Sequence, residues 1–342
     1  MKPKHPVTPK SLVSKVFATV LLASSFLATL HGTALATDKT SVKFTAGAAV
    51  PHAVQYMIFP DDHSIGKIFI LAKPWNVVAS PLNATFYINA KGKVLAPQGA
   101  SYAFTANELA AERPEYLSHF PAGTLQSLNS SYISINDDYL KAIGQITSLQ
   151  RLDLNETDLE DRQLAYLKDL KNMRCFSINK TLIKGPGLAH ISAMKELMFI
   201  NVSGNSLQPG STRYLSKFTH INDIGLAHCM LRDDDLLEIA KIKSLTSIRC
   251  PFNYGVTDLG IKYLDALPNL ATIDIDETQV TVPGLMALKK HKLCVIALPT
   301  KFNNKKDTTL LHSAFPKTIL GFSGRTKIEP VEFFDPKNML GR

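Results

Sequence analysis

The chain has 342 residues, of which 45% are hydrophobic and 20% are charged; these proportions are typical of a globular protein and exclude a disordered or collagenous one. Its formal net charge is +9, but four lysines without an acidic residue lie in residues 1–36, and residues 301–342 carry a net +4. The region between is close to neutral and has no basic stripe with aromatic residues, which argues against nucleic-acid binding.

The first 36 residues have the layout of a secretory signal peptide. Four lysines precede the apolar run Val16–Leu30, and Ala34-Leu35-Ala36 follows it. This order of segments predicts cleavage after Ala36 and a secreted, periplasmic or cell-envelope protein. The apolar run is short for a membrane span, which disfavours the alternative of an uncleaved anchor. No later run is long and apolar enough to give the mature chain a transmembrane segment.

Residues 37–122 lack any repeat, and we interpret them as a small β-rich N-terminal module. Short runs separated by turn signals such as Ala90-Lys91-Gly92 predict its strands, at Lys67–Leu71, Ala84–Asn89, Lys93–Leu95 and Ser101–Thr105. Because the end of a repeat array needs a cap, we expect this module to cover the first repeat. Asp61-Asp62-His63 is interpreted as a polar loop, not a metal site, and Trp75 as a core residue.

A period of 24 residues runs from Gly123 to His291, with one extra residue near Asn253–Gly255. The apolar positions of one copy and of the next are Leu149, Leu152, Leu154, Leu159, Leu164, Leu167 and Leu170, then Met173, Phe176, Ile178, Ile183, Leu188, Ile191 and Met194. Each copy begins with L-x-x-L-x-L, which predicts a short strand with one buried face. It ends with L-x-x-L-x-x-L, which predicts a helix or 3₁₀ turn with one apolar stripe. Thr212 and His291 stand where leucine is expected.

Two polar columns recur in the repeats. The first holds small residues that we expect to satisfy buried backbone groups where the chain turns inward: Thr157, Thr181, Asn205, Cys229, Asn253 and Thr278. This column is interpreted as a structural ladder. The second is an aspartate three residues before the first leucine of the helical stripe, at Asp137, Asp161, Asp233 and Asp258. An aspartate there can accept hydrogen bonds from the N–H groups that a starting helix leaves unpaired.

The run Val256–Leu270 (VTDLGIKYLDALPNL) resembles the leucine-rich-repeat family in its short bacterial form, which is similar to the cysteine-containing repeats found behind F-boxes. The resemblance covers residues 123–300. A period repeated this often is a specific signal for fold. The resemblance implies an α/β fold: a curved leucine-rich-repeat solenoid with parallel strands on its concave face. An F-box-type adaptor is disfavoured by the export signal and by the absence of an F-box-like helical segment.

We find no catalytic motif of credible spacing: no G-x-S-x-G, H-E-x-x-H, P-loop or G-x-G-x-x-G. We therefore expect no enzyme, no cofactor and no metal. The four cysteines, Cys175, Cys229, Cys250 and Cys294, have irregular spacing and no C-x-x-C pair. They are interpreted mostly as small buried residues, and whether any of them pair stays open. His228 lies in the turn after a predicted strand and is interpreted as a surface histidine.

The remaining function is binding. Residues between the buried leucines of each strand point to the concave side, and we expect the centre of a site there at Phe199, Asn201, Asp223, Arg249 and Asp274. A rigid polar surface around an exposed aromatic residue, Phe199, suits a protein or peptide partner. The alternative is a structural envelope or surface spacer held to anionic surfaces by its basic tail. Residues 301–342 are predicted either to cap the last repeat or to form that tail.

Overall fold

The computed structural model describes residues 54–72 and 84–323, all of which belong to one of the two units into which the chain divides. The predicted signal peptide, Trp75 and residues 324–342 lie outside this part. No helix within it is long and apolar enough to cross a membrane.

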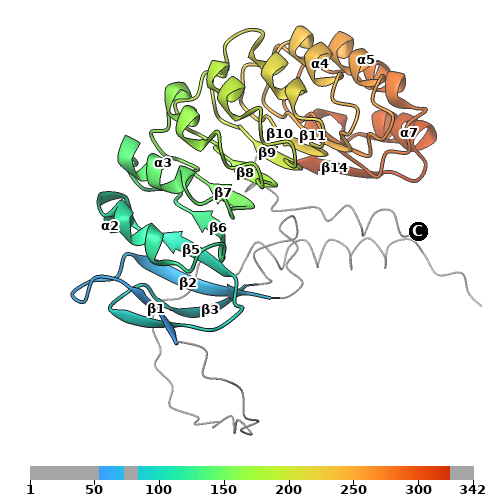
Figure 1. Ribbon diagram of the computed structural model, residues 1–342. Coiled ribbons are helices and arrows are strands. Elements are labelled where there is room, and N and C mark those ends of the chain that lie inside the picture. The colour runs from blue at the N-terminus through green and yellow to red at the C-terminus, as the bar shows by residue number, and fades with distance from the viewer. Residues whose placement is uncertain (1–53, 73–83, 324–342) are drawn as a thin grey trace, which may run out of the picture. The chain divides into compact units, whose positions relative to one another are not determined.

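Twelve strands form one sheet, in the order β14-β13-β12-β11-β10-β9-β8-β7-β6-β5-β2-β3. From β5 (Tyr102–Ala106) onward every neighbouring pair is parallel and follows the chain order (Figure 1). The other strands of this run are β6 (Leu125–Asn129), β7 (Arg151–Asp153), β8 (Cys175–Ser177), β9 (Phe199–Asn201), β10 (Asp223–Gly225), β11 (Ser247–Arg249), β12 (Thr272–Asp274), β13 (Val295–Pro299) and β14 (Ile319–Ser323). Successive copies of the 24-residue repeat therefore contribute successive strands, and the fold is a leucine-rich-repeat solenoid.

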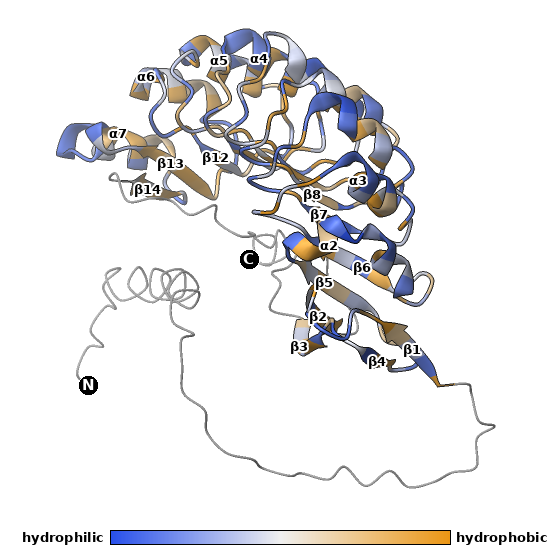
Figure 2. Ribbon diagram, turned by 90° about the vertical axis from the view of Figure 1, so that its left-hand side faces the viewer, coloured by the Kyte–Doolittle hydropathy of each residue, from blue (hydrophilic) through white to orange (hydrophobic). Residues whose placement is uncertain are grey.

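Short helices, many of them 3₁₀, return the chain from one strand to the next. They are α3 (Asp137–Gly144), η3 (Asp161–Leu167), η4 (Pro186–Ile191), η5 (Ser211–Lys217), α4 (Asp233–Ile239), α5 (Asp258–Leu264), α6 (Val282–Leu285), η6 (Met286–Leu288), η7 (Thr300–Phe302) and α7 (Lys305–Ala314). In Figure 2 these helices alternate between hydrophobic and hydrophilic colours, as expected of elements with one buried side.

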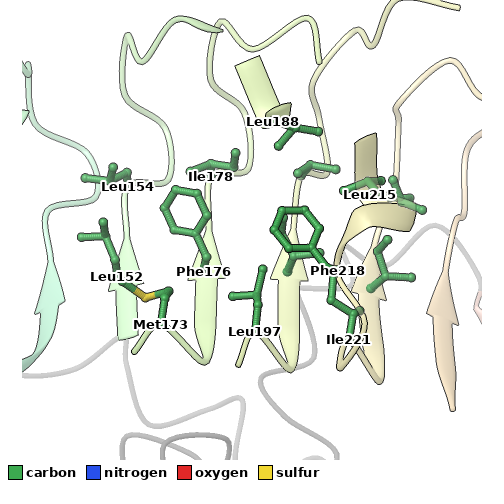
Figure 3. Close-up of a cluster of buried hydrophobic side chains, with 14 of the residues drawn as sticks. Leu152, Leu154, Met173, Phe176, Ile178, Leu188, Leu197, Leu215, Phe218 and Ile221 are labelled. Atoms are coloured by element: carbon green, nitrogen blue, oxygen red, sulfur yellow. The ribbon is translucent and has the colours of Figure 1, made fainter. Parts of the chain in front are cut away.

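The predicted apolar skeleton is the core between strands and helices (Figure 3). Its strand residues, such as Leu152, Phe176 and Ile200, are fully buried, and so are helix residues such as Leu188 and Leu215. Thr212, one of the two exceptions to the leucine pattern, is also buried and donates a hydrogen bond to Asp235 (2.9 Å).

The N-terminal module shares its sheet with the repeats. The four predicted strands are confirmed as β2 (Gly66–Leu71), β3 (Ala84–Asn89), β4 (Lys93–Ala96) and β5. A further strand, β1 (Gln55–Ile58), pairs with β4 in a separate two-stranded sheet. Two short helices, α2 (Glu108–Glu112) and η2 (Pro114–His119), lead to the first repeat. Because β5 pairs in parallel with β6, the hydrogen bonding of the solenoid begins inside this module.

The sheet also extends beyond the 24-residue pattern, which ends at His291. Strand β13 continues the ladder, and β14 adds a last parallel strand after α7. From Leu270 to Leu293 the spacing shortens to 23 residues, and α7 buries only Leu311. The 24-residue pattern is thus lost while the backbone pairing persists. Within residues 301–323, β14 pairs with β13 at the end of the array.

Aspartates at the helix starts join neighbouring repeats. Asp161 accepts hydrogen bonds from the backbone N–H groups of Lys184, Gly185 and Gly187 (2.7–3.0 Å). Asp233 in the same way accepts from Thr257 N and Gly260 N. We expected each aspartate to serve its own helix, and this is wrong: the groups served belong to the next repeat.

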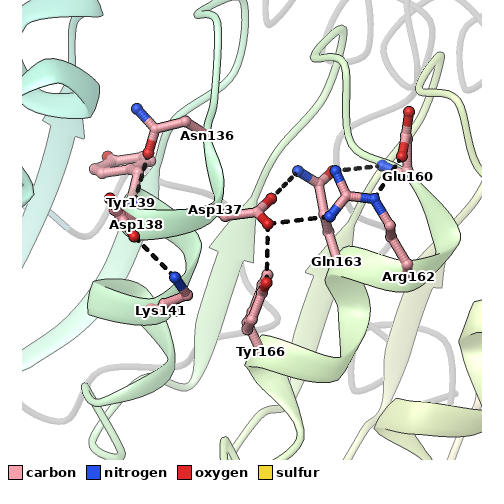
Figure 4. A network of polar contacts seen from close by, with 9 residues as sticks. All are labelled: Asn136, Asp137, Asp138, Tyr139, Lys141, Glu160, Arg162, Gln163 and Tyr166. Atoms are coloured by element: carbon pink, nitrogen blue, oxygen red, sulfur yellow. Dashed lines mark hydrogen bonds and ion pairs between the residues drawn. The ribbon is translucent and has the colours of Figure 1, made fainter.

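The first aspartate of this column reaches the side chains of the next helix (Figure 4). Asp137 accepts hydrogen bonds from Gln163, Tyr166 and Arg162. These bonds, that of Gln163 first, lower the pKa of the Asp137 carboxyl to about 2. The helix-side aspartates therefore act as inter-repeat ties.

The column of small residues lies at the turn after each strand. Asn253 is fully buried; its amide group donates to the carbonyls of Leu226 and Cys250 (2.8 and 2.9 Å), and its oxygen accepts from the N–H groups of Cys229 and Leu231 (both 3.0 Å). The other members make bonds of the same kind. Thr157, Thr181 and Thr278 each donate to the carbonyl three residues earlier, Asn205 donates to Ile178 and Val202, and Cys229 donates to Val202. These bonds satisfy backbone groups that would otherwise be buried without partners.

Candidate binding surface

The strand face of the solenoid is formed by the two columns of side chains that alternate with the buried core residues on the strands. The first column is Ser127, Arg151, Cys175, Phe199, Asp223, Ser247 and Thr272, and the second is Asn129, Asp153, Ser177, Asn201, Gly225, Arg249 and Asp274. The parallel register sets each residue beside its equivalent in the next strand, as in the pairs Phe199–Asp223 and Arg249–Asp274. All five residues of the hypothesised site lie on this face.

Phe199 was expected to be exposed, and this is wrong: only 7% of its surface is accessible. The Arg249 guanidinium lies over its ring at 5.5 Å from the ring centroid. Strands of one sheet are about 5 Å apart, so the side chains of a column pack against one another. The ring therefore belongs to a packed layer and does not project as an anchor.

Asp223 and Arg249 form an ion pair next to this ring. Arg249 Nη2 lies 2.9 Å from Asp223 Oδ1, with 16% and 10% of the two side chains exposed. Burial raises the pKa of the Asp223 carboxyl, and the Arg249 charge opposes this shift. The ion pair is therefore largely shielded from water, and charges attract more strongly there than in bulk water.

Asn201 and Asp274 have local structural partners. Asn201 Oδ1 accepts a hydrogen bond from Ser203 N (3.0 Å), and Asp274 Oδ1 accepts one from Asp276 N (3.2 Å). Gly225 leaves room for the Asn201 amide, because a Cβ atom at Gly225 would lie 2.5 Å from Asn201 Oδ1. Burial raises the pKa of Asp274 to about 6, and the Asp276 carboxylate contributes in the same direction.

A second ion pair on this face was not singled out from the sequence. Arg151 Nε lies 2.7 Å from Asp153 Oδ2, and Arg151 Nη2 lies 3.2 Å from Asp153 Oδ1. Side chains two residues apart on a strand share a face, so an Arg-x-Asp strand was the available signal. The two ion pairs stand on either side of Cys175 and Phe199.

The described residues also contain buried thiols and one cleft away from β7–β12 in the sequence. No group of three or more His, Cys, Asp and Glu side chains within them could hold a metal ion. Burial raises the pKa of the Cys175 and Cys229 thiols to about 12, so both stay protonated at neutral pH. A cleft of about 500 Å³ near η2 is lined mainly by apolar residues, and Glu115 is its sole charged residue.

No protein-family model matches this sequence, and no curated protein matches it. Among solved structures the chain is similar to internalin C2 of Listeria monocytogenes, with 20% identity over 57% of this chain and 80% of that chain and a TM-score of 0.46. It is also similar to a second internalin of that organism (inlF), with 16% identity over 64% of this chain and 62% of that chain and a TM-score of 0.44. The fold assignment rests on the repeat geometry described above.

Proposed function

We propose that the chain is an exported, non-catalytic binding protein that takes a protein or peptide partner along its strand face. The observation that carries the proposal is the cluster of Phe199, Asp223 and Arg249 at the middle of that face. An arginine, a carboxylate and an aromatic ring are in contact there, on strands whose turns are tied by the buried ladder. Arginine and aromatic residues are enriched at the cores of protein interfaces.

The spacing of the charges supports a partner with a matching pattern. Arg151 and Asp153 lie on β7, and the Asp223–Arg249 pair lies on β10 and β11. Charges fixed at two such places set the orientation and register of a partner more than its affinity. The packed Cys175 and Phe199 between them supply an apolar strip.

Export is supported by the arrangement of residues 1–36, and the non-catalytic assignment rests on the lack of a catalytic motif of credible spacing in the sequence. A static, prearranged surface needs no cofactor to bind a partner, because the cost of ordering its side chains has already been met in folding.

The test uses variants that neutralise both members of one ion pair and so keep the net charge constant. Asp223→Asn with Arg249→Gln alters the strand face, and Asp138→Asn with Lys141→Gln alters an ion pair on helix α3. Crosslinked partners are captured from native envelope or extracellular material, then purified and titrated calorimetrically with each variant. We expect at least about tenfold weaker binding for the strand-face variant alone, with thermal unfolding close to the parent. Equal affinity of both variants, or binding that disappears only at high salt, would exclude the strand face and favour the spacer held by a basic tail.

A further inference from the structure

One column of residues follows the strands and lies along the loop edge of the solenoid. This loop-edge column has a left-handed backbone throughout, with φ between 49° and 73°, at Tyr132, Glu156, Lys180, Gly204, His228, Phe252 and Glu277. The amide of each member up to Phe252 donates to a backbone carbonyl of the next repeat, as His228 N does to Pro251 O (3.1 Å) and Phe252 N to Asp276 O (2.8 Å). Neighbouring members of the column are therefore neighbours in space.

The chemistry of the column changes along its length. Lys180 Nζ lies 2.6 Å from Glu156 Oε1, so these two charges are paired. Two repeats further on, the His228 and Phe252 rings stack at 4.3 Å between centroids and 5° between planes. His228 and Phe252 are successive members of the column, so His228 covers one face of the Phe252 ring, and Glu277 is the next member beyond Phe252.

The side chains of Met230 and Tyr254 extend the aromatic stack into a larger apolar surface. Met230 is 71% exposed and Tyr254 63% exposed. Their segments run side by side, because Arg232 pairs with Gly255 and Leu231 N donates to Asn253. We call His228, Met230, Phe252 and Tyr254 the loop-edge patch.

Stability of the fold does not account for this patch. His228, Met230 and Phe252 all have positive φ values (51°, 59° and 59°), where a side chain other than glycine or asparagine is energetically unfavourable. An exposed ring stack offsets this cost only in part. Of these, His228 and Met230 are exposed and Phe252 is half-buried, and apolar groups exposed at positions of positive φ are typical of a surface that binds.

The side of the patch beyond Phe252 is acidic. Glu277 is the next member of the column, and within the described residues its carboxylate has no hydrogen bond or ion pair. The neighbouring Asp276 side chain is only 2% exposed, and its Oδ1 accepts a hydrogen bond from Glu277 N (3.0 Å). Glu277 is therefore the acidic group that this side of the patch offers to a bound cation.

We propose that the loop-edge patch is a second binding surface, which takes an arginine side chain of a protein partner between the Phe252 ring and the Glu277 carboxylate. A guanidinium group is planar, stacks on aromatic faces and pairs with a carboxylate through its edge, whereas the compact lysine ammonium matches only the charge. Met230 and Tyr254 would contact the apolar stem of the arginine and its flanking residues. This surface is separate from the strand face, and the inference does not depend on the function proposed there.

The experiment uses the full chain, labelled with ¹³C at its histidine rings, and two blocked peptides as probes. One is acetyl-Gly-Gly-Arg-Gly-Gly-amide; the other carries citrulline, which has the shape of arginine without the charge. We expect the His228 ring signal, assigned with His228→Asn, to shift saturably with the arginine peptide. The citrulline peptide should bind at least about fivefold more weakly, as expected for loss of a cation–π contact and an ion pair.

Three variants decide the outcome. Glu277→Gln and Phe252→Leu should each weaken the arginine peptide about fivefold, while thermal unfolding shows that they stay folded. Asp223→Asn with Arg249→Gln should leave the response unchanged, so failure of the strand-face proposal cannot be confused with failure of this one. Equal shifts by both peptides, no shift of His228, or an undiminished response in Glu277→Gln would overturn the inference.

Discussion

The strand face and the loop edge are built from the same repeats in the same parallel register, yet their side chains are used in opposite ways. On the strand face, Asp223 is paired with Arg249, and Phe199 lies 7% exposed beneath that arginine. On the loop edge, Met230 and Tyr254 are mostly exposed, and Phe252 shares its stack with His228 on a left-handed backbone.

The difference shows that periodic position does not by itself identify a binding group. A strand-face residue meets equivalents about 5 Å away on both sides, so charges and rings there contact one another. A loop-edge residue also has equivalents in the repeats before and after it, but it lies at the turn beyond the strand, where Met230 and Tyr254 stay 71% and 63% exposed. Contacts between neighbours stabilise the first surface, and the second keeps its apolar groups at a cost.

The largest expected effect is a difference in unfolding free energy between variants of Phe199 and of Phe252. Phe199→Ala should lower the free energy of unfolding by about 3 kcal/mol, because it leaves a cavity beneath Arg249. Phe252→Gly should change it by less than about 1 kcal/mol, since glycine relieves the positive φ while the stack is lost. Urea unfolding followed by circular dichroism measures both. A similar loss in the two variants would mean that the loop edge is part of the core, and the comparison would fail.

The repeats were readable from the sequence because each copy buries residues of one type at fixed positions. Leucine and isoleucine at 24-residue spacing predicted the strands and most helices, and the small polar column identified residues such as Asn253 that bond buried backbone groups. The end of the array was missed, since backbone pairing continued through β13 and β14 after the apolar spacing had changed.

The candidate site was harder to predict, because exposure depends on neighbours in space. Phe199 is flanked by Cys175 and Asp223 only once the strands are aligned, and its cover, Arg249, comes from two strands away. His228 and Phe252 lie 24 residues apart. Nothing in the sequence shows a positive φ at bulky residues, so the loop-edge patch could not be found from spacing alone.

The second largest effect is a pH dependence of stability caused by Asp274, a buried charge of the strand face. The pKa of Asp274 is raised from 3.8 to about 6 by burial, so the folded chain binds this proton more tightly than the unfolded chain. The resulting stability is full at low pH and is lost as pH rises through about 6. Asp274→Asn cannot ionise, and its side-chain oxygen can still accept the hydrogen bond from Asp276 N. We expect this variant to match the parent near pH 4 and to exceed it by about 2 kcal/mol near pH 7.5.

Urea unfolding at a series of pH values measures this difference, with Asp138→Asn as the matched exposed control. That control removes a carboxylate paired with Lys141 on the surface of α3, and it should give no gain at neutral pH. If Asp274→Asn is less stable than the parent near neutral pH, the Asp274 carboxylate is a needed structural charge, and the strand face there is not under electrostatic strain.

The smallest expected effect comes from the hydrogen bonds that Asp233 accepts from the next repeat. It tests whether these bonds also hold the loop edge in place. Asp233→Ala removes the bonds to Thr257 N, Thr257 Oγ1 and Gly260 N, and it should cost about 1 kcal/mol, as for the loss of a helix cap. Asp234→Ala, one residue along and exposed, should cost almost nothing. Hydrogen exchange should show faster opening near residues 252–257 in the first variant alone, because Asp233 fixes the segment that follows Phe252 and Tyr254. Equal exchange in the two variants would show that the buried Asn253 is enough to hold these rings, and that the aspartate ties stabilise only the helix side.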